Sequence, residues 1–326
     1  MTSAVITNGQ SAVDLLDQAG IGDLLLSWDD TLHDGPVPLT DDMAALIPIR
    51  IEFLDKLGGL AKGVATARFA ARTEKLAQLD QYDFVVLWFE HDLYDQLQLL
   101  QAIDTIAGEM GRETGLFLVQ ADDYLIRWTP QTIGSLAQTA KEISADQVGL
   151  AREAWLRFRQ PTPVEWAELL AADTSLLPYL ESSVERLLQD LPAPGTGLAR
   201  TQLQILNAIE NGADQPHKLF RAVQDMEEAH FMGDLSFWRW LDNMAFTAQP
   251  LVEGLPDGGL GAAVGRDAIN TYLTAPLHLT PMADKVRTGA IDLASIKPID
   301  HWMGGTHVAN DNLWRWDRAD RKLISP

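Results

Sequence analysis

The chain has 326 residues, enough for two or three domains and a large buried core. Hydrophobic residues make up 46% of the chain and charged residues 22%, which is typical of a globular protein and excludes a disordered chain. The lack of cysteine excludes disulfides, thiolate metal sites and cysteine nucleophiles. No apolar run is long enough for a membrane-spanning helix and no secretory signal is visible, so we predict a cytoplasmic protein without a membrane partner.

The charge is unevenly distributed along the chain. A net charge of −21 arises from 46 acidic and 25 basic residues, and residues 1–130 alone hold 21 acidic and 8 basic side chains. A field of this sign repels nucleic acid and attracts cations. We therefore expect a cation-attracting site in the first part of the chain, and we disfavour DNA as a partner.

Residues 1–129 alternate short apolar runs with helical patterns, which is typical of an α/β domain with a parallel sheet. The predicted strands cover residues 4–6, 24–26, 84–89 and 116–119, and the predicted helices cover residues 11–18, 43–57 and 64–79. Ser11 is the expected cap of the first helix. A further helix after residue 92 has one apolar face, formed by Leu93, Leu97, Leu100 and Ile103. Together these elements predict a small, doubly wound parallel sheet.

The rest of the chain lacks this alternation. Residues 130–192 have a helical pattern without strand runs, which predicts a helical connector, and the Pro- and Gly-rich residues 192–197 predict a linker. Residues 198–326 contain three predicted helices, at 198–211, 216–228 and 234–246, followed by apolar segments at 250–252 and 276–279 that a Gly-rich stretch separates. That stretch suits a hairpin, so this order predicts a winged-helix-like domain, which we expect a C-terminal hairpin to close.

Polar side chains follow the predicted strands, at the edge where open parallel sheets bind ligands. Those expected to converge there follow the second and third strands: Asp29, Asp30, His33, Glu90, His91 and Asp92. Crowded carboxylates raise one another's pKa, which suits general acid–base catalysis, and with imidazole they can hold a divalent cation. We predict His91, Glu90, Asp29 and His33 as catalytic residues. We predict Asp29, Asp30 and Asp92 as ligands of Mg²⁺, Mn²⁺ or Zn²⁺.

The segment after the first strand is a candidate anion cradle. Asn8, Gly9 and Ser11 lie where the first helix begins, and N–H groups at a helix N-terminus bind phosphate or carboxylate groups. Arg50 and Arg72, on the following helices, are expected to neutralise the bound anion. Neither Gly-x-Gly-x-x-Gly nor a P-loop motif occurs, which argues against NAD, FAD and P-loop nucleotide binding.

The third predicted C-terminal helix is a poor candidate for reading DNA. Its one basic residue, Arg239, lies between Asp234 and Asp242. A helix that enters the major groove usually carries basic side chains. We therefore expect this region to have a structural or protein-interaction role.

Several motifs resemble a known family. They include Ile-Thr-Asn-Gly-Gln-Ser at 6–11, Trp-Phe-Glu-His-Asp at 88–92 and Asp-His-Trp-Met-Gly-Gly-Thr-His at 300–307. These segments are similar to those of the bacterial "domain of unknown function 1835" family, and the resemblance covers nearly the whole chain. It implies no activity, because the family is named for lacking one. Gln10 stands where the family more usually has Asp, which weakens a metal-binding role for that position.

These observations favour an enzyme with an acidic, His-containing cleft. We predict metal-assisted or general acid–base chemistry of a hydrolase-like kind on a small phosphate- or nucleotide-like ligand. One alternative is a transcriptional regulator that senses a ligand and binds DNA through its winged helix. Another is a non-catalytic protein-interaction module.

Overall fold

A five-stranded sheet forms the centre of the N-terminal part of the chain. The structure is a computed structural model that describes residues 1–57, 61, 63–109 and 115–326. The chain divides into two units, the first comprising residues 1–55, 60–184 and 303–306 and the second comprising residues 56–59, 185–302 and 307–326. Each unit is described by itself.

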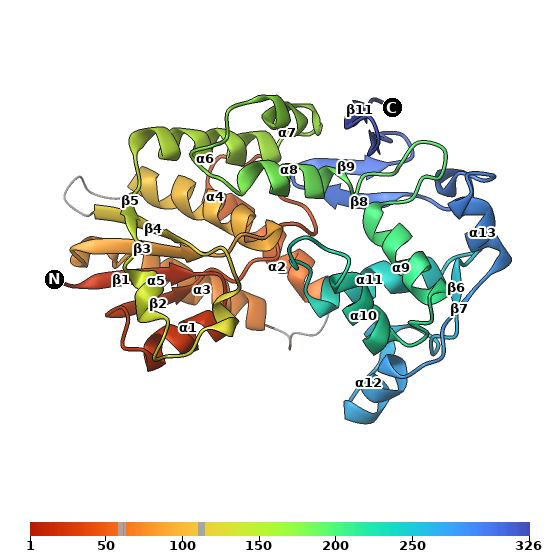
Figure 1. Cartoon of the computed structure of the whole chain (residues 1–326), viewed down its shortest axis with the longest axis horizontal. Coiled ribbons are helices and arrows are strands. Elements are labelled where there is room, and N and C mark those ends of the chain that lie inside the picture. Colours follow the sequence, from red (N-terminus) through yellow and green to blue (C-terminus); the bar gives the residue numbers. More distant parts are fainter. Residues whose placement is uncertain (58–60, 62, 110–114) are drawn as a thin grey trace. The chain divides into compact units, whose positions relative to one another are not determined.

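The sheet of the first unit has the strand order β2-β1-β3-β4-β5 (Figure 1). Its members are β1 (Ser3–Thr7), β2 (Leu24–Ser27), β3 (Phe84–Phe89), β4 (Gly115–Gln120) and β5 (Lys141–Glu142). The first four strands are parallel, which confirms the predicted parallel α/β sheet. Thr7 lies opposite both Ser27 and Trp88, so the carboxyl ends of β1, β2 and β3 meet at one edge.

Strand β5 was not predicted, and the expectation of no strand between residues 130 and 192 is therefore wrong. β5 pairs antiparallel with β4 and consists of Lys141 and Glu142, two exposed charged residues. Because a two-residue edge strand of charged side chains has no apolar alternation, its sequence carries no strand signal.

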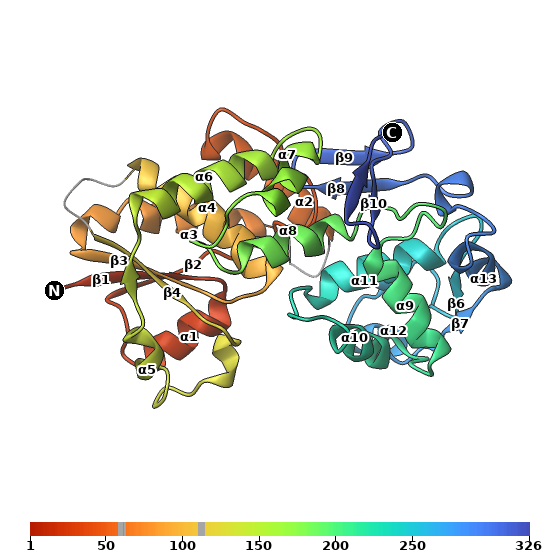
Figure 2. The ribbon, with the colours of Figure 1, turned by 45° about the horizontal axis from the view of Figure 1, so that its top comes forward.

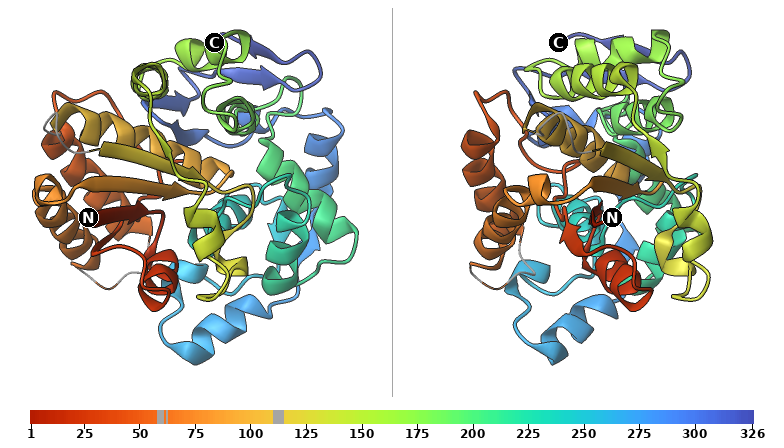
Figure 3. Two further views of the ribbon diagram at one scale, coloured as in Figure 1. Left: turned by 60° about the vertical axis from the view of Figure 1, so that its left-hand side comes forward. Right: turned by 90° about the vertical axis from the view of Figure 1, so that its left-hand side faces the viewer.

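Helices cover both faces of this sheet (Figures 2 and 3). They are α1 (Gln10–Gln18), α2 (Met43–Leu57), α3 (Val64–Leu76), α4 (Leu93–Glu109), α5 (Gly134–Ala137), α6 (Ala145–Phe158) and α7 (Val164–Glu168). On one face, Ala12 and Leu16 of α1 pack in a core cluster with Trp88 of β3 and Leu136 of α5. On the other face α4 lies under α6, and the predicted apolar face of α4 is buried.

In the first unit, the limits of two predicted helices differ from the structure. Helix α1 begins at Gln10 with Gly9 as its N-cap, so Ser11 lies within the helix and does not cap it. Gly9 has no side chain, and the first turn of α1 consequently has no side-chain cap. Helix α3 ends at Leu76, before a short 3₁₀ turn at Leu79–Gln81.

A Gly-Gly bend from the end of the chain completes the first unit. Gly304 has φ +57°, and its carbonyl accepts a hydrogen bond from the backbone N–H of Val37 at 2.7 Å. Gly305 lies so close to α6 that a Cβ atom there would be 1.9 Å from the carbonyl oxygen of Arg159. This bend requires glycine because the backbone of residues 158–160 occupies the space of a side chain.

We expect Gly305→Ala to lower the free energy of unfolding by about 1–3 kcal/mol, since the new methyl group would collide with the Arg159 carbonyl. Urea denaturation followed by circular dichroism measures this change. The matched control is Gly149→Ala in α6, where a Cβ would have no neighbour within 4 Å. The control should be neutral or stabilising, because alanine favours a helix. Equal stability of the two variants would contradict the assignment.

The second unit contains the three helices predicted after residue 198. They are α9 (Arg200–Glu210), α10 (Pro216–Gln224) and α11 (Asp234–Ala245), preceded by α8 (Leu180–Leu188), which begins in the first unit. β6 (Val252–Glu253) pairs antiparallel with β7 (His278–Leu279), but α12 (Arg266–Leu273) lies between them in the chain. The Gly-rich stretch is thus not a simple hairpin turn.

The chain then continues through α13 (Pro281–Arg287) to short strands. β8 (Asp300–Met303) and β9 (Thr306–Ala309) form one two-stranded sheet. β10 (Arg315–Asp317) pairs antiparallel with β11 (Lys322–Ile324), which confirms the predicted closing hairpin. None of the helices in the described part of the chain has both the length and the apolar character needed to cross a bilayer.

Candidate functional site

The site lies where the strand order of the N-terminal sheet reverses. β1 has β2 on one side and β3 on the other, so the chain crosses over β1 between its second and third strands. In open parallel sheets ligands bind beside this reversal, at the carboxyl ends of the strands. Asn8 follows β1 and Glu90 follows β3, and both contact Asp95. The Asn8 side-chain amide donates to the Asp95 carboxylate at 3.0 Å, and the Glu90 backbone N–H donates to it at 2.6 Å.

Three buried carboxyl groups meet at this point. One oxygen of each of Glu90, Asp92 and Asp95 lies within 4.8 Å of the others, an arrangement that could hold a metal ion. The Glu90 carboxylate accepts a hydrogen bond from the backbone N–H of Leu125 at 2.7 Å. The Asp92 carboxylate accepts from the backbone N–H of Tyr94 and of Asp95 at the start of α4. We call these three residues the acid triad.

Burial makes the acid triad hold protons more tightly than ordinary carboxyl groups. Burial and the neighbouring Glu90 charge raise the pKa of Asp92 to about 7. Burial, with the charges of Asp92 and Glu90, raises the pKa of Asp95 well above its usual range. The pKa of Glu90 is raised by burial, although hydrogen bonds from Leu125 and Asn8 oppose the change. Asp92 can therefore exchange a proton near neutral pH, and the acid triad could hold a cation in place of protons.

The residues predicted as metal ligands do not all lie in the acid triad. Of Asp29, Asp30 and Asp92, the structure places only Asp92 in the acid triad, and it adds Glu90 and Asp95. Asp95 was missed although it follows Asp92 by three residues at the start of a predicted helix, where both face the helix N-terminus. The donor set consists of carboxylate oxygens, which suits Mg²⁺ or Mn²⁺ better than Zn²⁺.

The two histidines lie outside the acid triad. The His91 ring packs against the rings of Tyr124 and Tyr179, with centroid distances of 5.0 and 5.9 Å. His33 is buried, and its ring meets the edge of Tyr94 at 6.0 Å. Neither imidazole belongs to the possible metal-ligand group found among the described residues. The side chain of a residue that follows a strand can point towards either face of the sheet, and the sequence does not show which face it takes.

Asp30 was predicted to bind a metal ion and Arg50 to bind an anion, but in the structure the two side chains bind each other. Both side chains are fully buried, and the Arg50 guanidinium binds the Asp30 carboxylate at 2.8 Å. Arg50 also donates to the backbone carbonyls of the loop after β2, at Thr31, Asp34 and Pro36. Because these bonds use the donors of the guanidinium, Arg50 anchors the loop and is not a ligand for an anion.

A pocket of about 220 Å³ opens beside the carboxyl end of β2. Residues of α1, β2 and α3 line it: Gln10, Val13, Leu26, Ser27, Trp28, Asp29, Arg68, Phe69, Ala71, Arg72 and Lys75. We call it the β2 pocket. Of the predicted ligand-binding residues it includes Arg72 but not Asn8, Gly9 or Ser11, and Ser11 is exposed. Lys75 was not predicted, although its spacing from Arg68 and Arg72 places all three on one face of α3.

Arg72 is the unusual member of this pocket. Its side chain is only 4% exposed, and its guanidinium lies over the rings of Trp28 and Phe69, at 4.6 and 4.3 Å from their centroids. Nη1 donates to the Trp28 carbonyl at 2.9 Å, whereas Nη2 is buried without a hydrogen-bond partner among the described residues. Burial lowers the pKa of Arg72 to about 10, although the charge of Asp30 opposes the change. A buried cationic donor without an acceptor is costly unless a ligand completes it.

Asp29 faces the same pocket. Its backbone has φ +59°, an unusual conformation that aspartate tolerates better than most residues. Its carboxylate binds Arg68 at 3.1 Å and lies beside the N-terminus of α1, 3.9 Å from where a Cβ on Gly9 would be. Burial raises the pKa of Asp29, and the Arg68 charge partly opposes this. The backbone N–H of Asp29 donates to the Asn8 carbonyl, which joins the β2 pocket to the acid triad through one residue.

Comparisons of the chain with protein-family models and with curated proteins give no match. The resemblance based on the motifs at 6–11, 88–92 and 300–307 stays a prediction.

Proposed function

We propose that the N-terminal unit is a hydrolase-like enzyme that binds a small phosphate- or nucleotide-like anion in the β2 pocket and uses Asp29 for acid–base chemistry. The observation that carries this proposal is the buried Nη2 of Arg72, a cationic donor that finds no acceptor in the described part of the chain and belongs to a pocket that also contains Asp29. Phosphate oxygens are strong acceptors for guanidinium groups, so a bound phosphate would supply the missing partner.

The other cations of the pocket favour the same class of ligand. Arg68 pairs with Asp29 and is 45% exposed, so it can turn towards a ligand at little cost. The Lys75 ammonium donates to the Leu25 carbonyl at 2.7 Å and has no carboxylate in that contact. Three cations on one face of α3 concentrate positive charge within a chain whose net charge is −21. An anion would be attracted to this place and repelled from most of the remaining surface.

Asp29 has the properties of a general acid or base. Its pKa is raised, which brings proton transfer closer to neutral pH, and its carboxylate lies at the wall of the pocket. A divalent ion held by Glu90, Asp92 and Asp95 would supply Lewis-acid chemistry at the acid triad, which Asn8 connects to Asp29. Asn8 then acts as a positioning residue, because its side chain contacts Asp95 and its carbonyl holds the backbone of Asp29.

The test separates binding from turnover in the full-length protein. We expect inorganic phosphate to bind the wild type in isothermal titration calorimetry, and Arg72→Met to weaken binding at least about tenfold. Asp29→Asn should keep phosphate binding but lower the hydrolysis of 4-nitrophenyl phosphate by about 100-fold or more. Arg72→Lys retains the charge and should bind with intermediate affinity.

The matched control is Arg127→Met, which removes an exposed arginine paired with Asp123 and should change neither measurement. Circular dichroism verifies that each variant is folded. The proposal is wrong if phosphate does not bind the wild type, or if Arg72→Met and Arg127→Met bind it equally well.

The alternative of DNA binding by the second unit has less support. Its three helices and the β6–β7 pair follow the order of a winged helix, but two of the basic side chains that would contact DNA are paired with acids. Arg200 binds Glu228 at 2.7 Å, and Lys218 binds Asp214 at 3.1 Å. The Trp238 ring packs with Phe237 inside the unit. We therefore propose a structural or protein-contact role for this arrangement.

A further inference from the structure

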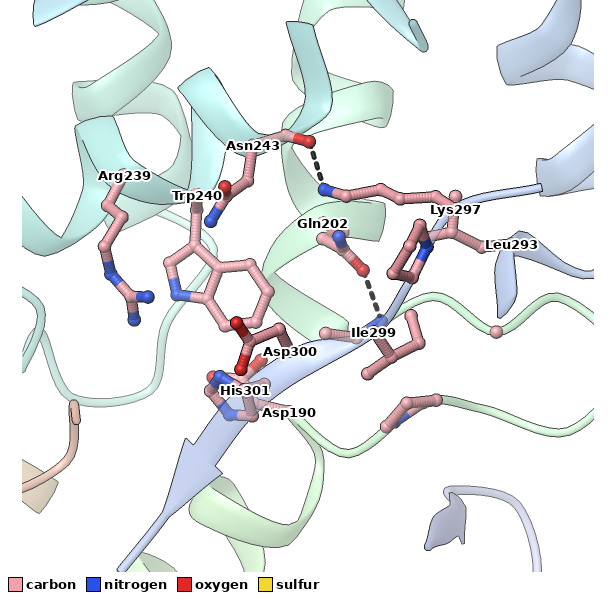
Figure 4. Close-up of a pocket in the computed structure, with 14 residues that line it drawn as sticks. Asp190, Gln202, Arg239, Trp240, Asn243, Leu293, Lys297, Ile299, Asp300 and His301 are labelled. Atoms are coloured by element: carbon pink, nitrogen blue, oxygen red, sulfur yellow. Dashed lines mark hydrogen bonds between the residues drawn. The ribbon is translucent and has the colours of Figure 1, made fainter. Parts of the chain in front are cut away.

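We propose that the second unit contains a separate ligand site for a small planar molecule with one anionic group. The site is a pocket of about 230 Å³ between α11, the start of α9 and the segment 293–301 (Figure 4). The residues that line it all belong to the second unit: Asp190, Pro192, Gly197, Ala199, Gln202, Arg239, Trp240, Asn243, Leu293, Lys297, Pro298, Ile299, Asp300 and His301. It is therefore distinct from the β2 pocket.

The charged groups of this pocket differ in the partners that they bind. The Asp190 carboxylate binds Arg186 at 2.9 Å and Thr201 at 3.0 and 3.1 Å, and Asp300 pairs with His307 at 2.8 Å. The Lys297 ammonium, by contrast, contacts the backbone carbonyl of Asn243. Burial lowers the pKa of Lys297. Asp190 thus has a cationic partner and Asp300 binds an imidazole, whereas the Lys297 ammonium has no carboxylate partner among the described residues.

A second cation, Arg239, lies on the other side of the Trp240 indole. Figure 4 shows the Trp240 indole between the side chains of Arg239 and Lys297. Two cations from different elements, α11 and the segment after η5 (Leu293–Ser295), therefore flank one ring. A carboxylate or phosphate oxygen would be a stronger hydrogen-bond acceptor for the Lys297 ammonium than the backbone carbonyl of Asn243 is.

The remaining lining suits a flat ring. The Trp240 indole is half-buried and lies 5.0 Å from the His301 ring, with an angle of 45° between the two planes. Leu293, Pro298 and Ile299 supply apolar surface to the same pocket. The carbonyl oxygen of the Gln202 side chain is bound to the backbone N–H of Ala199 at 3.0 Å, which fixes the orientation of the amide. Aromatic side chains beside a few fixed polar groups are typical of a site for a small planar ligand.

The experiment uses two anionic probes and their neutral analogues on the full-length protein. 4-Hydroxybenzoate carries a carboxylate on its planar ring, and AMP carries a phosphate that ribose joins to a planar base; 4-hydroxybenzamide and adenosine lack the charge. We expect at least one anionic probe to bind the Arg72→Met variant, whose β2 pocket is altered, with 1:1 stoichiometry in calorimetry, and its neutral analogue to bind at least about tenfold more weakly. The probe that binds identifies the anionic group.

Variants locate the binding in this pocket. Lys297→Met should weaken binding of the anionic probe about tenfold, whereas Lys297→Arg retains the charge and should bind close to the wild type. Trp240→Leu should weaken both the anionic probe and its neutral analogue, since it removes the stacking surface. Lys285→Met, at an exposed lysine of α13, is the matched control and should have no effect.

Arg72→Met, which alters the β2 pocket, should leave the stoichiometry at this site unchanged. Thermal unfolding verifies that each variant is folded. The inference is overturned if neither anionic probe binds, or if Lys297→Met binds as tightly as Lys285→Met.

Discussion

Arg50→Met is expected to lower the free energy of unfolding by about 3–5 kcal/mol, because it leaves the Asp30 carboxylate buried without its cation. Both side chains of this ion pair are fully buried. The substitution also removes the donors from the carbonyls of Thr31, Asp34 and Pro36, which shape the loop after β2. Urea denaturation followed by tryptophan fluorescence measures the loss.

Two further variants separate burial of the charge from simple loss of an ion pair. Asp30→Asn combined with Arg50→Met should recover part of the stability, since no unpaired buried charge remains. Arg152→Met breaks the more exposed pair with Asp104 and should cost at most about 1 kcal/mol. If Arg50→Met is no more destabilising than Arg152→Met, the loop does not depend on this pair.

Stability should fall as the pH rises from about 4 to about 7, because the acid triad must lose protons while it stays buried. The pKa of Asp92 is about 7 in the folded protein against 3.8 for an ordinary aspartate. Between these values the folded chain binds more protons than the unfolded chain, so each increase in pH favours unfolding, and the loss from this group ends above pH 7. Its size is on the order of a few kcal/mol, since one pKa unit corresponds to about 1.4 kcal/mol. Urea denaturation across this pH range, with EDTA present, measures it.

Asp92→Asn tests whether the acid triad causes this pH dependence. The amide is neutral and can still cap α4, so the variant should be more stable than the wild type at pH 8 and should show a flatter profile. Asp257→Asn, at an exposed position, should keep the wild-type profile. Millimolar MgCl₂ without EDTA should restore stability to the wild type at pH 8 and have less effect on Asp92→Asn. A profile that Asp92→Asn leaves unchanged would show that other groups are responsible.

Much of the fold is readable from local patterns. The uninterrupted apolar run at Phe84–Phe89 predicts a strand that is buried on both faces, and β3 is the third strand of a five-stranded sheet. The spacing of Leu93, Leu97 and Leu100 predicts the buried face of α4. β5 cannot be predicted in this way, because its two charged residues pair with β4 through backbone groups alone.

The sequence predicts the edge of the sheet at which the candidate site lies, but not which residues form the site. Parallel strands end at the same edge of a sheet, which the sequence predicts, and the position of β1 between β2 and β3, which only the structure shows, makes Asn8, Asp29 and Glu90 neighbours. The sequence does not distinguish Arg50 from Arg72, since both are arginines on helices that follow β2. The structure pairs Arg50 with a buried aspartate and leaves Nη2 of Arg72 without an acceptor.

By itself, then, the sequence determined most of the strands and helices of the N-terminal sheet and that acidic residues gather at one edge of it. The strands and helices follow from the periodicity of apolar residues, which is a property of neighbouring residues. The shared edge follows from the common direction of parallel strands. The tertiary structure alone decided which charges are paired and which face a pocket. A charge is stabilised by partners that approach from distant parts of the chain and by the loss of water around it, and no local pattern contains either.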